Sequence, residues 1–192
     1  RSSGLKLDER GYVTVDGYGR TNLDGVWALG DITPGHALAH RAFEQGITIA
    51  EKIAGADPKP VFDDTVPQVV FSFPEAASVG LTLDQAKARE DVVEPKETAY
   101  PMLSNARMLM SGEGGSMTVV SGAFANNPDM QVVLGVHIVS PIASDLIAEA
   151  EQLVGNRVPL ADAARLIHPH PTFSETLGEA LLKADGRPLH TR

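Results

Sequence analysis

The pattern of hydrophobic and polar positions divides the first third of the chain into short extended runs followed by one long helix. Residues 12–15 are β-prone, and residues 26–29 form an apolar run that stops at a Gly-Asp pair, which is typical of a strand buried on both faces. From residue 36 to residue 54, apolar side chains recur at spacings of three and four, which predicts an amphipathic helix. Gly55 and Pro58 predict its end.

The stretch at residues 55–67, which contains three prolines, predicts a boundary between two domains. We place these domains at residues 1–57 and 65–192. Beyond the boundary, β-prone runs predict strands, the last two of which are joined by a turn at residues 126–129. The predicted strands lie at residues 69–73, 94–102, 116–124 and 131–139.

Helical patterns accompany these strands. Thr82 and Gln85 have the spacing of a capping box and predict a short helix to about residue 90. Three helices follow: one with an apolar stripe at residues 146–154, one opened by Pro159, and one with its apolar face at residues 173–184. The second domain is therefore predicted to be α+β, an antiparallel sheet with flanking helices.

Composition narrows the possible functions. The formal net charge of -9 disfavours binding to nucleic acid, because phosphates repel an acidic surface. The absence of cysteine excludes disulfides and thiolate metal sites within these 192 residues. No apolar run approaches the length of a membrane span, so we expect no membrane partner and a cytoplasmic location. The chain does not begin with methionine, which suggests a fragment of a longer protein.

The most informative motif lies at residues 167–175, which read Ile-His-Pro-His-Pro-Thr-Phe-Ser-Glu. Pro171 suits the first position of a helix, so His170 is expected just before a helix and Glu175 in its first turns. A carboxylate bonded to one imidazole nitrogen sets the tautomer and leaves the other nitrogen for a substrate, as acid–base catalysis requires. Two surface histidines beside a capped helix are the alternative. No third ligand is spaced for a metal.

This motif resembles the C-terminal active-site motif of the pyridine nucleotide–disulfide oxidoreductases, and within them it is most similar to the dihydrolipoamide dehydrogenase group. The resemblance implies that His170 is the acid–base catalyst and that Glu175 orients it. Residues 67–82, 105–107 and 134–138 resemble the interface domain of the same family. The implied fold is a dimerisation domain preceded by the end of an α/β FAD-binding domain.

Residues 21–31 resemble the second flavin motif of that family, an apolar strand that ends in Gly-Asp. At a strand end, Asp31 can accept hydrogen bonds from ribityl hydroxyls, and Gly30 lets the backbone come close to a ligand. Leu38, Ala39 and His40 open the following helix, whose N-terminus would face the flavin ring. An ordinary turn is the alternative for a Gly-Asp pair alone.

The resemblance implies FAD and NAD as cofactors, dihydrolipoamide as substrate and a homodimer as the assembly. It also suggests docking to the acyltransferase core of a 2-oxo acid dehydrogenase complex. The first flavin motif, the nicotinamide domain and the redox cysteine pair of the family would precede this chain, so the chain alone is expected to be inactive. A mycothione or glutathione type of disulfide reductase, and a non-catalytic dimerisation module, remain as alternatives.

Overall fold

The computed structural model describes residues 3–191. Contacts divide the chain into two compact units, Arg1–Val66 and Pro67–Arg192. Each unit is described here by itself.

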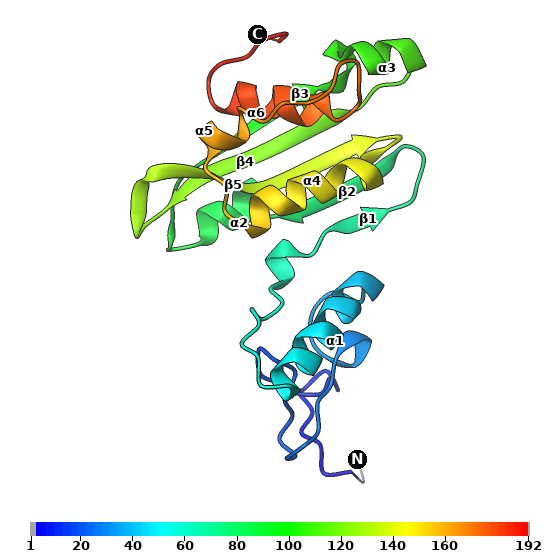
Figure 1. The fold of residues 1–192 in the computed structure, drawn as a ribbon, viewed down its shortest axis with the longest axis vertical. Helices are drawn as coiled ribbons and strands as arrows, with labels where there is room; N and C mark the ends of the chain where they lie inside the picture. The colour runs from blue at the N-terminus through cyan, green and yellow to red at the C-terminus, as the bar shows by residue number, and fades with distance from the viewer. Residues whose placement is uncertain (1–2, 192) are drawn as a thin grey trace. The chain divides into compact units, whose positions relative to one another are not determined.

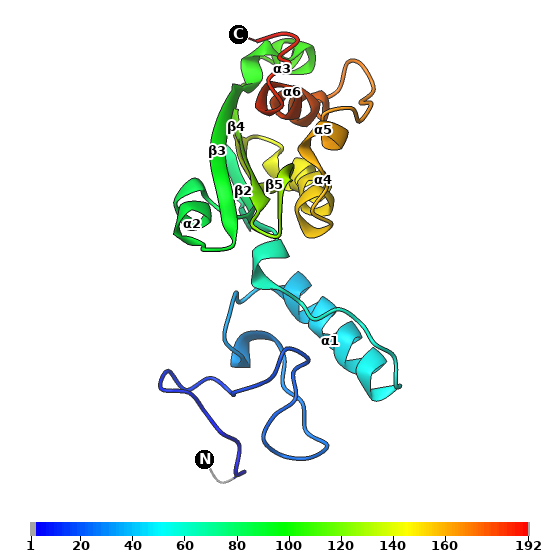
Figure 2. The same cartoon turned by 90° about the vertical axis from the view of Figure 1, so that its left-hand side faces the viewer.

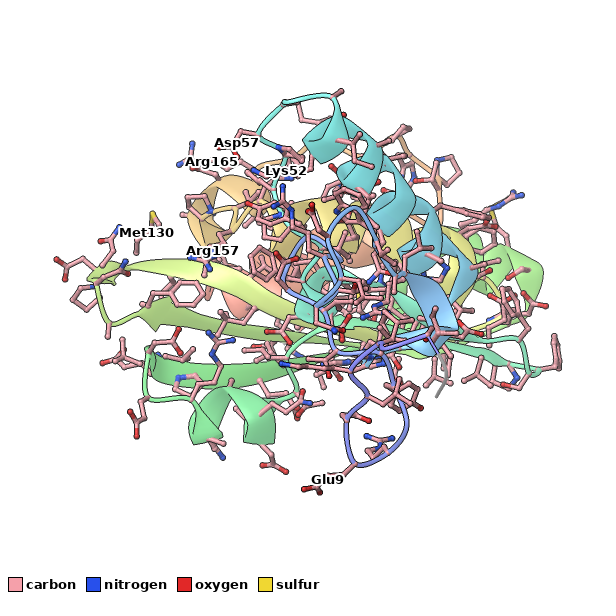
Figure 3. All side chains as sticks on the ribbon, turned by 90° about the horizontal axis from the view of Figure 1, so that it is seen from below. Glu9, Lys52, Asp57, Met130, Arg157 and Arg165 are labelled. Atoms are coloured by element: carbon pink, nitrogen blue, oxygen red, sulfur yellow. The ribbon has the colours of Figure 1, made fainter. Side chains whose placement is uncertain are left out.

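The first unit is built around one helix, α1 (Ala39–Ile53), as the apolar spacing predicted. Two short 3-10 turns accompany it, η1 (Gly30–Ile32) and η2 (Asp63–Thr65). The helix ends at the predicted position, where Lys52 Nζ pairs with a carboxylate oxygen of Asp57 at 2.8 Å (Figure 3). A cation in the last turn suits the negative end of the helix dipole.

The predicted strand at residues 26–29 is wrong. Trp27 makes only an isolated bridge with Arg20, and Val26 and Leu29 are 39% and 38% exposed. The Ala28 N–H donates to the carbonyl of Gly19 at 2.8 Å, but the described part of this unit contains no ladder in which the run could pair on both edges. Without neighbouring strands, an apolar run has no sheet to enter.

The second unit is the predicted α+β domain, whose five-stranded sheet is antiparallel throughout and has the order β1-β2-β5-β4-β3 (Figure 1). Its strands are β1 (Gln68–Val70), β2 (Glu75–Gly80), β3 (Val92–Pro101), β4 (Ser116–Phe124) and β5 (Asn127–Ser140). The strands predicted at residues 94–102, 116–124 and 131–139 are confirmed as β3, β4 and β5. The turn predicted at residues 126–129 is wrong, because β5 already begins at Asn127, which pairs with Phe124, and the turn lies at residues 125–126.

The strand predicted at residues 69–73 is only partly correct. It ends at Val70, which pairs with Ala76 across a hairpin, so residues 71–74 form the turn. The sequence pattern did not predict β2, because five of its six residues are small or acidic and only Val79 is strongly β-prone.

Helices cover both faces of the sheet: Figure 2 shows α2 on one side and α4 and α5 on the other. The helices are α2 (Leu83–Ala88), α3 (Ala106–Ser111), α4 (Ala143–Gly155), α5 (Leu160–Ala163) and α6 (Glu175–Ala184). The predicted capping box of α2 is confirmed, since Thr82 Oγ1 accepts from the Gln85 N–H and Gln85 Oε1 accepts from the Thr82 N–H. The helix α3 was not predicted.

The two faces of the sheet carry separate hydrophobic clusters. The larger one joins the sheet to α4, α5 and α6, and the smaller one joins it to Ala86 of α2. Where β2 ends against β5 the backbones approach so closely that a Cβ at Gly80 would lie 2.2 Å from the Leu134 carbonyl oxygen, and one at Gly135 would lie 2.2 Å from that of Leu81. Only glycine fits at this crossing.

The two outer strands of the sheet are short or interrupted. The strand β1 has three residues, and β3 loses its register with β4 between Val93 and Lys96. Pro95 lies in that interruption, where its missing N–H breaks no ladder bond, and Glu94 adopts φ +50°. Irregular β3 therefore forms one edge and the short β1 the other.

Candidate active site

The predicted His–Glu contact is present on the loop that leads from α5 into α6. His170 Nδ1 lies 2.9 Å from Glu175 Oε1, and the histidine side chain is 70% exposed. Neutral imidazole that donates from Nδ1 to this carboxylate keeps Nε2 as an acceptor. The pair can therefore take up a proton at Nε2 and hold the resulting positive charge beside a carboxylate.

Glu175 is itself fixed by the backbone. Its Oε2 accepts a hydrogen bond from the Thr172 N–H at 2.7 Å. Partial burial alone would raise the pKa of Glu175, but the Thr172 N–H, the hydrogen bond to His170 and the charges of His170 and His168 hold this pKa below its usual value. The carboxylate is thus ionised and oriented when the imidazole is neutral.

The expected place of Pro171 at the first helical position is wrong. The helix α6 begins at Glu175, and Pro171 lies in the irregular segment before it. Thr172 and Glu175 have the spacing of a capping box, and the glutamate folds back onto the Thr172 N–H. The N-cap residue of α6 is Ser174, which makes no side-chain capping bond, so this spacing does not mark the observed start of the helix.

The loop is also anchored by α3, a contact that the sequence did not predict. Asn105 caps α3 by accepting from the Met108 N–H at 3.0 Å, and its Nδ2 donates to the Thr172 carbonyl at 3.1 Å. The Arg107 guanidinium lies over the ring of Phe173, 5.4 Å from its centroid. Asn105 is buried, so its two bonds fix the position of the loop relative to the sheet.

The residues predicted to bind flavin lie in the first unit, whereas His170 and Glu175 lie in the second. Gly30 adopts φ +69°, and its N–H donates to Gln45 Oε1 of α1 at 2.8 Å. A Cβ added at Gly30 would contact Ala42 at 3.4 Å, so the Gly-Asp turn packs on the first half of α1. Asp31 is exposed on that turn.

The start of α1 has the properties of an anion-facing helix end. Leu38 is the N-cap residue and supplies no side-chain hydrogen bond, and Ala39 and His40 are exposed in the first turn. The positive end of the helix dipole at this first turn suits an electron-rich ring edge or an anion. Asp31 offers acceptor oxygens on the turn that packs on α1, which suit the hydroxyl chain of a flavin, and the start of α1 offers partial positive charge, which suits its ring.

Within residues 3–191, no group of three or more histidine, aspartate or glutamate side chains is placed to hold a metal ion. No helix in the same range is long and apolar enough to cross a membrane.

An antiparallel sheet covered by helices on both faces, with a His–Glu pair at the start of its last helix, is the arrangement of a dimerisation domain of the disulfide reductase class. Residues 66–181 match the family described as pyridine nucleotide-disulphide oxidoreductase, dimerisation domain, and residues 1–46 match that described as pyridine nucleotide-disulphide oxidoreductase. The chain belongs to the pyridine nucleotide-disulphide oxidoreductase family.

Two curated relatives are each called dihydrolipoyl dehydrogenase. The protein from Cupriavidus necator is 41% identical over 97% of this chain, and that from Bacillus subtilis is 38% identical over 96%. The chain spans 38% of the length of each. Among solved structures, LpdA from Mycobacterium tuberculosis is 31% identical with a TM-score of 0.84, over 94% of this chain and 38% of its own. The flavoprotein disulfide reductase RclA from Escherichia coli, 22% identical with a TM-score of 0.77 over 93% of this chain and 40% of its own, shows the shared fold.

Proposed function

We propose that this chain is the dimerising and acid–base part of a dihydrolipoamide dehydrogenase, the enzyme that reoxidises dihydrolipoamide with NAD. The observation that supports it most directly is the contact of His170 Nδ1 with Glu175 at 2.9 Å, on an exposed loop with Nε2 left for a substrate. The names of the relatives from Cupriavidus necator and Bacillus subtilis support the same activity.

In the proposed reaction, Nε2 of His170 accepts the proton of a substrate thiol as the S–H bond breaks. Glu175 stabilises the imidazolium that forms, because its carboxylate is ionised and held by the Thr172 N–H. The resulting thiolate is the form that attacks a disulfide; a new S–S bond forms as the old one breaks, and the imidazolium gives its proton to the thiolate that leaves. Glu175 also fixes the neutral tautomer, so that the accepting nitrogen is always the outer one.

Residues 1–57 are proposed as the end of an FAD-binding domain, and residues 65–192 as the dimerisation domain. Asp31 would accept hydrogen bonds from the ribityl hydroxyls, Gly30 would let the backbone approach, and the first turn of α1, with Leu38, Ala39 and His40, would face the flavin ring. FAD supplies the electron transfer between dithiol and NAD when it is bound.

The proposed partners are a second copy of the protein, dihydrolipoamide and the acyltransferase core of a 2-oxo acid dehydrogenase complex. The match of residues 66–181 to a dimerisation domain supports the homodimer. Docking to the core and a cytoplasmic location stay predictions, which co-purification with the complex and cell fractionation would test.

His170→Gln in the complete gene product tests the function. Turnover of dihydrolipoamide with NAD should fall by roughly 10²–10⁴-fold, which is the usual contribution of a positioned acid–base group. His190→Gln is the matched control, because His190 also contacts a glutamate of α6, Glu179, but lies in the C-terminal segment. Unchanged turnover in His170→Gln would refute the acid–base role. Assays with mycothione and glutathione disulfide would separate the lipoamide enzyme from the other reductases of the family.

A further inference from the structure

A second histidine of the same loop, His168, is packed between two helices. Its Nε2 lies 2.8 Å from Glu149 Oε1 of α4, and its side chain is 9% exposed. On the other side it lies against the α6 backbone at Gly178, where an added Cβ would be 2.6 Å from Nδ1. The residue before it, Ile167, is 97% exposed, so the His168 side chain packs inward from a loop whose neighbouring residues are exposed.

The surroundings of His168 favour its charged form. The hydrogen bond to Glu149 raises the pKa of His168; burial acts against it, while the charge of Glu149, the backbone of Leu166 and the charge of Glu175 raise it further. The positive charge also acts on Glu175, since His168 is one of the groups that lower the pKa of that carboxylate. His168 therefore contacts the carboxylate of Glu149 on α4 and acts electrostatically on Glu175, the carboxylate that holds His170.

We propose that Glu149 and His168 form a positioning pair, which fixes the loop to α4 and α6 so that His170 and Glu175 stay in contact. His168 lies two residues before His170 and is held by Glu149. Thr172 lies two residues after His170 and is held by Asn105. The loop is therefore tied on both sides of His170, which itself stays exposed for a substrate. Gly178 contributes to this arrangement, because the absence of a side chain at this position leaves room for the His168 ring. The inference deepens the proposed function, since it assumes that the His170–Glu175 contact matters for catalysis.

The tautomer of His170 is the spectroscopic test. In the ¹⁵N-labelled chain, at a pH where His170 is neutral, its contact with Glu175 should show as a proton on Nδ1 rather than on Nε2. His168→Gln and Glu149→Gln should each lose this Nδ1–H signature, because the loop is no longer fixed. His190→Gln is the control and should keep it, since it breaks a histidine–glutamate contact of the same kind in the C-terminal segment.

An unchanged His170 tautomer in folded His168→Gln and Glu149→Gln chains would overturn the proposal. Loss of the signature in His190→Gln as well would also overturn it, since the effect would not be specific to the loop. Glu149→Gln retains the shape of a partly exposed side chain, so it provides the answer if His168→Gln does not fold.

The complete gene product gives an independent readout. There, kcat should fall by up to about 10²-fold in His168→Gln, as it does when a catalytic group is displaced by about 1 Å, while KM for NAD stays the same. Normal kcat together with a lost tautomer signature would overturn a positioning role in catalysis. Normal turnover in His170→Gln would refute the proposed function. The tautomer measurement would still show whether Glu149 and His168 position the loop.

Discussion

The effect of Gly178→Ala on the free energy of unfolding should depend on the residue at position 168. In an α-helix this substitution stabilises by about 1 kcal/mol, because alanine loses less backbone entropy than glycine. Here the new methyl group would lie 2.6 Å from His168 Nδ1 and 2.9 Å from Cε1, closer than a Cβ atom can approach a ring atom. The ring cannot withdraw freely, since Nε2 is held by Glu149 at 2.8 Å.

The gain in helix propensity and the cost of the steric clash can be compared directly. Forcing an extra carbon into a packed site costs about 1–3 kcal/mol, so Gly178→Ala should leave the wild-type chain between unchanged and about 2 kcal/mol less stable. In a His168→Ala background the obstructing ring is gone, and the same substitution should stabilise by about 1 kcal/mol. The double-mutant cycle should therefore give a coupling free energy of about 1–3 kcal/mol.

Urea unfolding of the four chains, followed by circular dichroism, measures these differences in the free energy of unfolding. The slope of each transition checks that the unfolded state is comparable. If Gly178→Ala stabilised the wild-type and His168→Ala chains equally, the ring of His168 would not lie on α6, and the reasoning about the packed loop would be refuted.

Three further predictions concern the same region. Glu175→Gln should lower turnover by roughly 10²-fold in the complete gene product, as measured by steady-state kinetics, because the imidazolium of His170 loses its carboxylate partner; full activity would contradict this. Wild type should be more stable than His168→Gln below pH 6.5, and this difference in the free energy of unfolding should shrink as pH rises through the raised pKa of His168, because the folded state holds that proton more tightly. Urea unfolding at several pH values measures the difference, and a difference that grows with pH would refute the prediction. Tyr100→Phe should stabilise the chain by about 1 kcal/mol or more, because the buried Tyr100 hydroxyl has no hydrogen-bond partner among the described residues. Burial, followed by the charges of Glu179 and Glu175, raises the pKa of Tyr100 to about 12. A lower urea midpoint in Tyr100→Phe would show that the hydroxyl does make a hydrogen bond.

The part of the site that is local in sequence could be predicted from the sequence. His170 and Glu175 are five residues apart, and the motif around them indicates that a carboxylate can reach the imidazole. Contacts that depend on helix packing could not be predicted in this way. Glu149 and His168 are 19 residues apart, and Asn105 and Thr172 are 67 apart, so both require the sheet to bring α3, α4 and α6 together.

The same distinction applies to the fold. The strands β4 and β5 could be predicted because each contains a continuous apolar run, and α1 because its apolar stripe follows the period of a helix. The short helix α3 was missed, since one and a half turns give too little periodicity and the Asn105 cap is its main signal. The run at residues 26–29 has the composition of a central strand, but a strand also needs neighbours, which a local pattern does not reveal.

The irregular margins of the sheet bear on how two copies could associate. A long, regular outer strand offers free N–H and C=O groups to any passing chain, which invites fibrous growth. In this domain the proline-containing bulge of β3 interrupts one such row, and the three residues of β1 make the other too short to serve as a template. Open-ended growth through the backbone edges of this sheet is thereby disfavoured, which is what the proposed two-fold dimer would require.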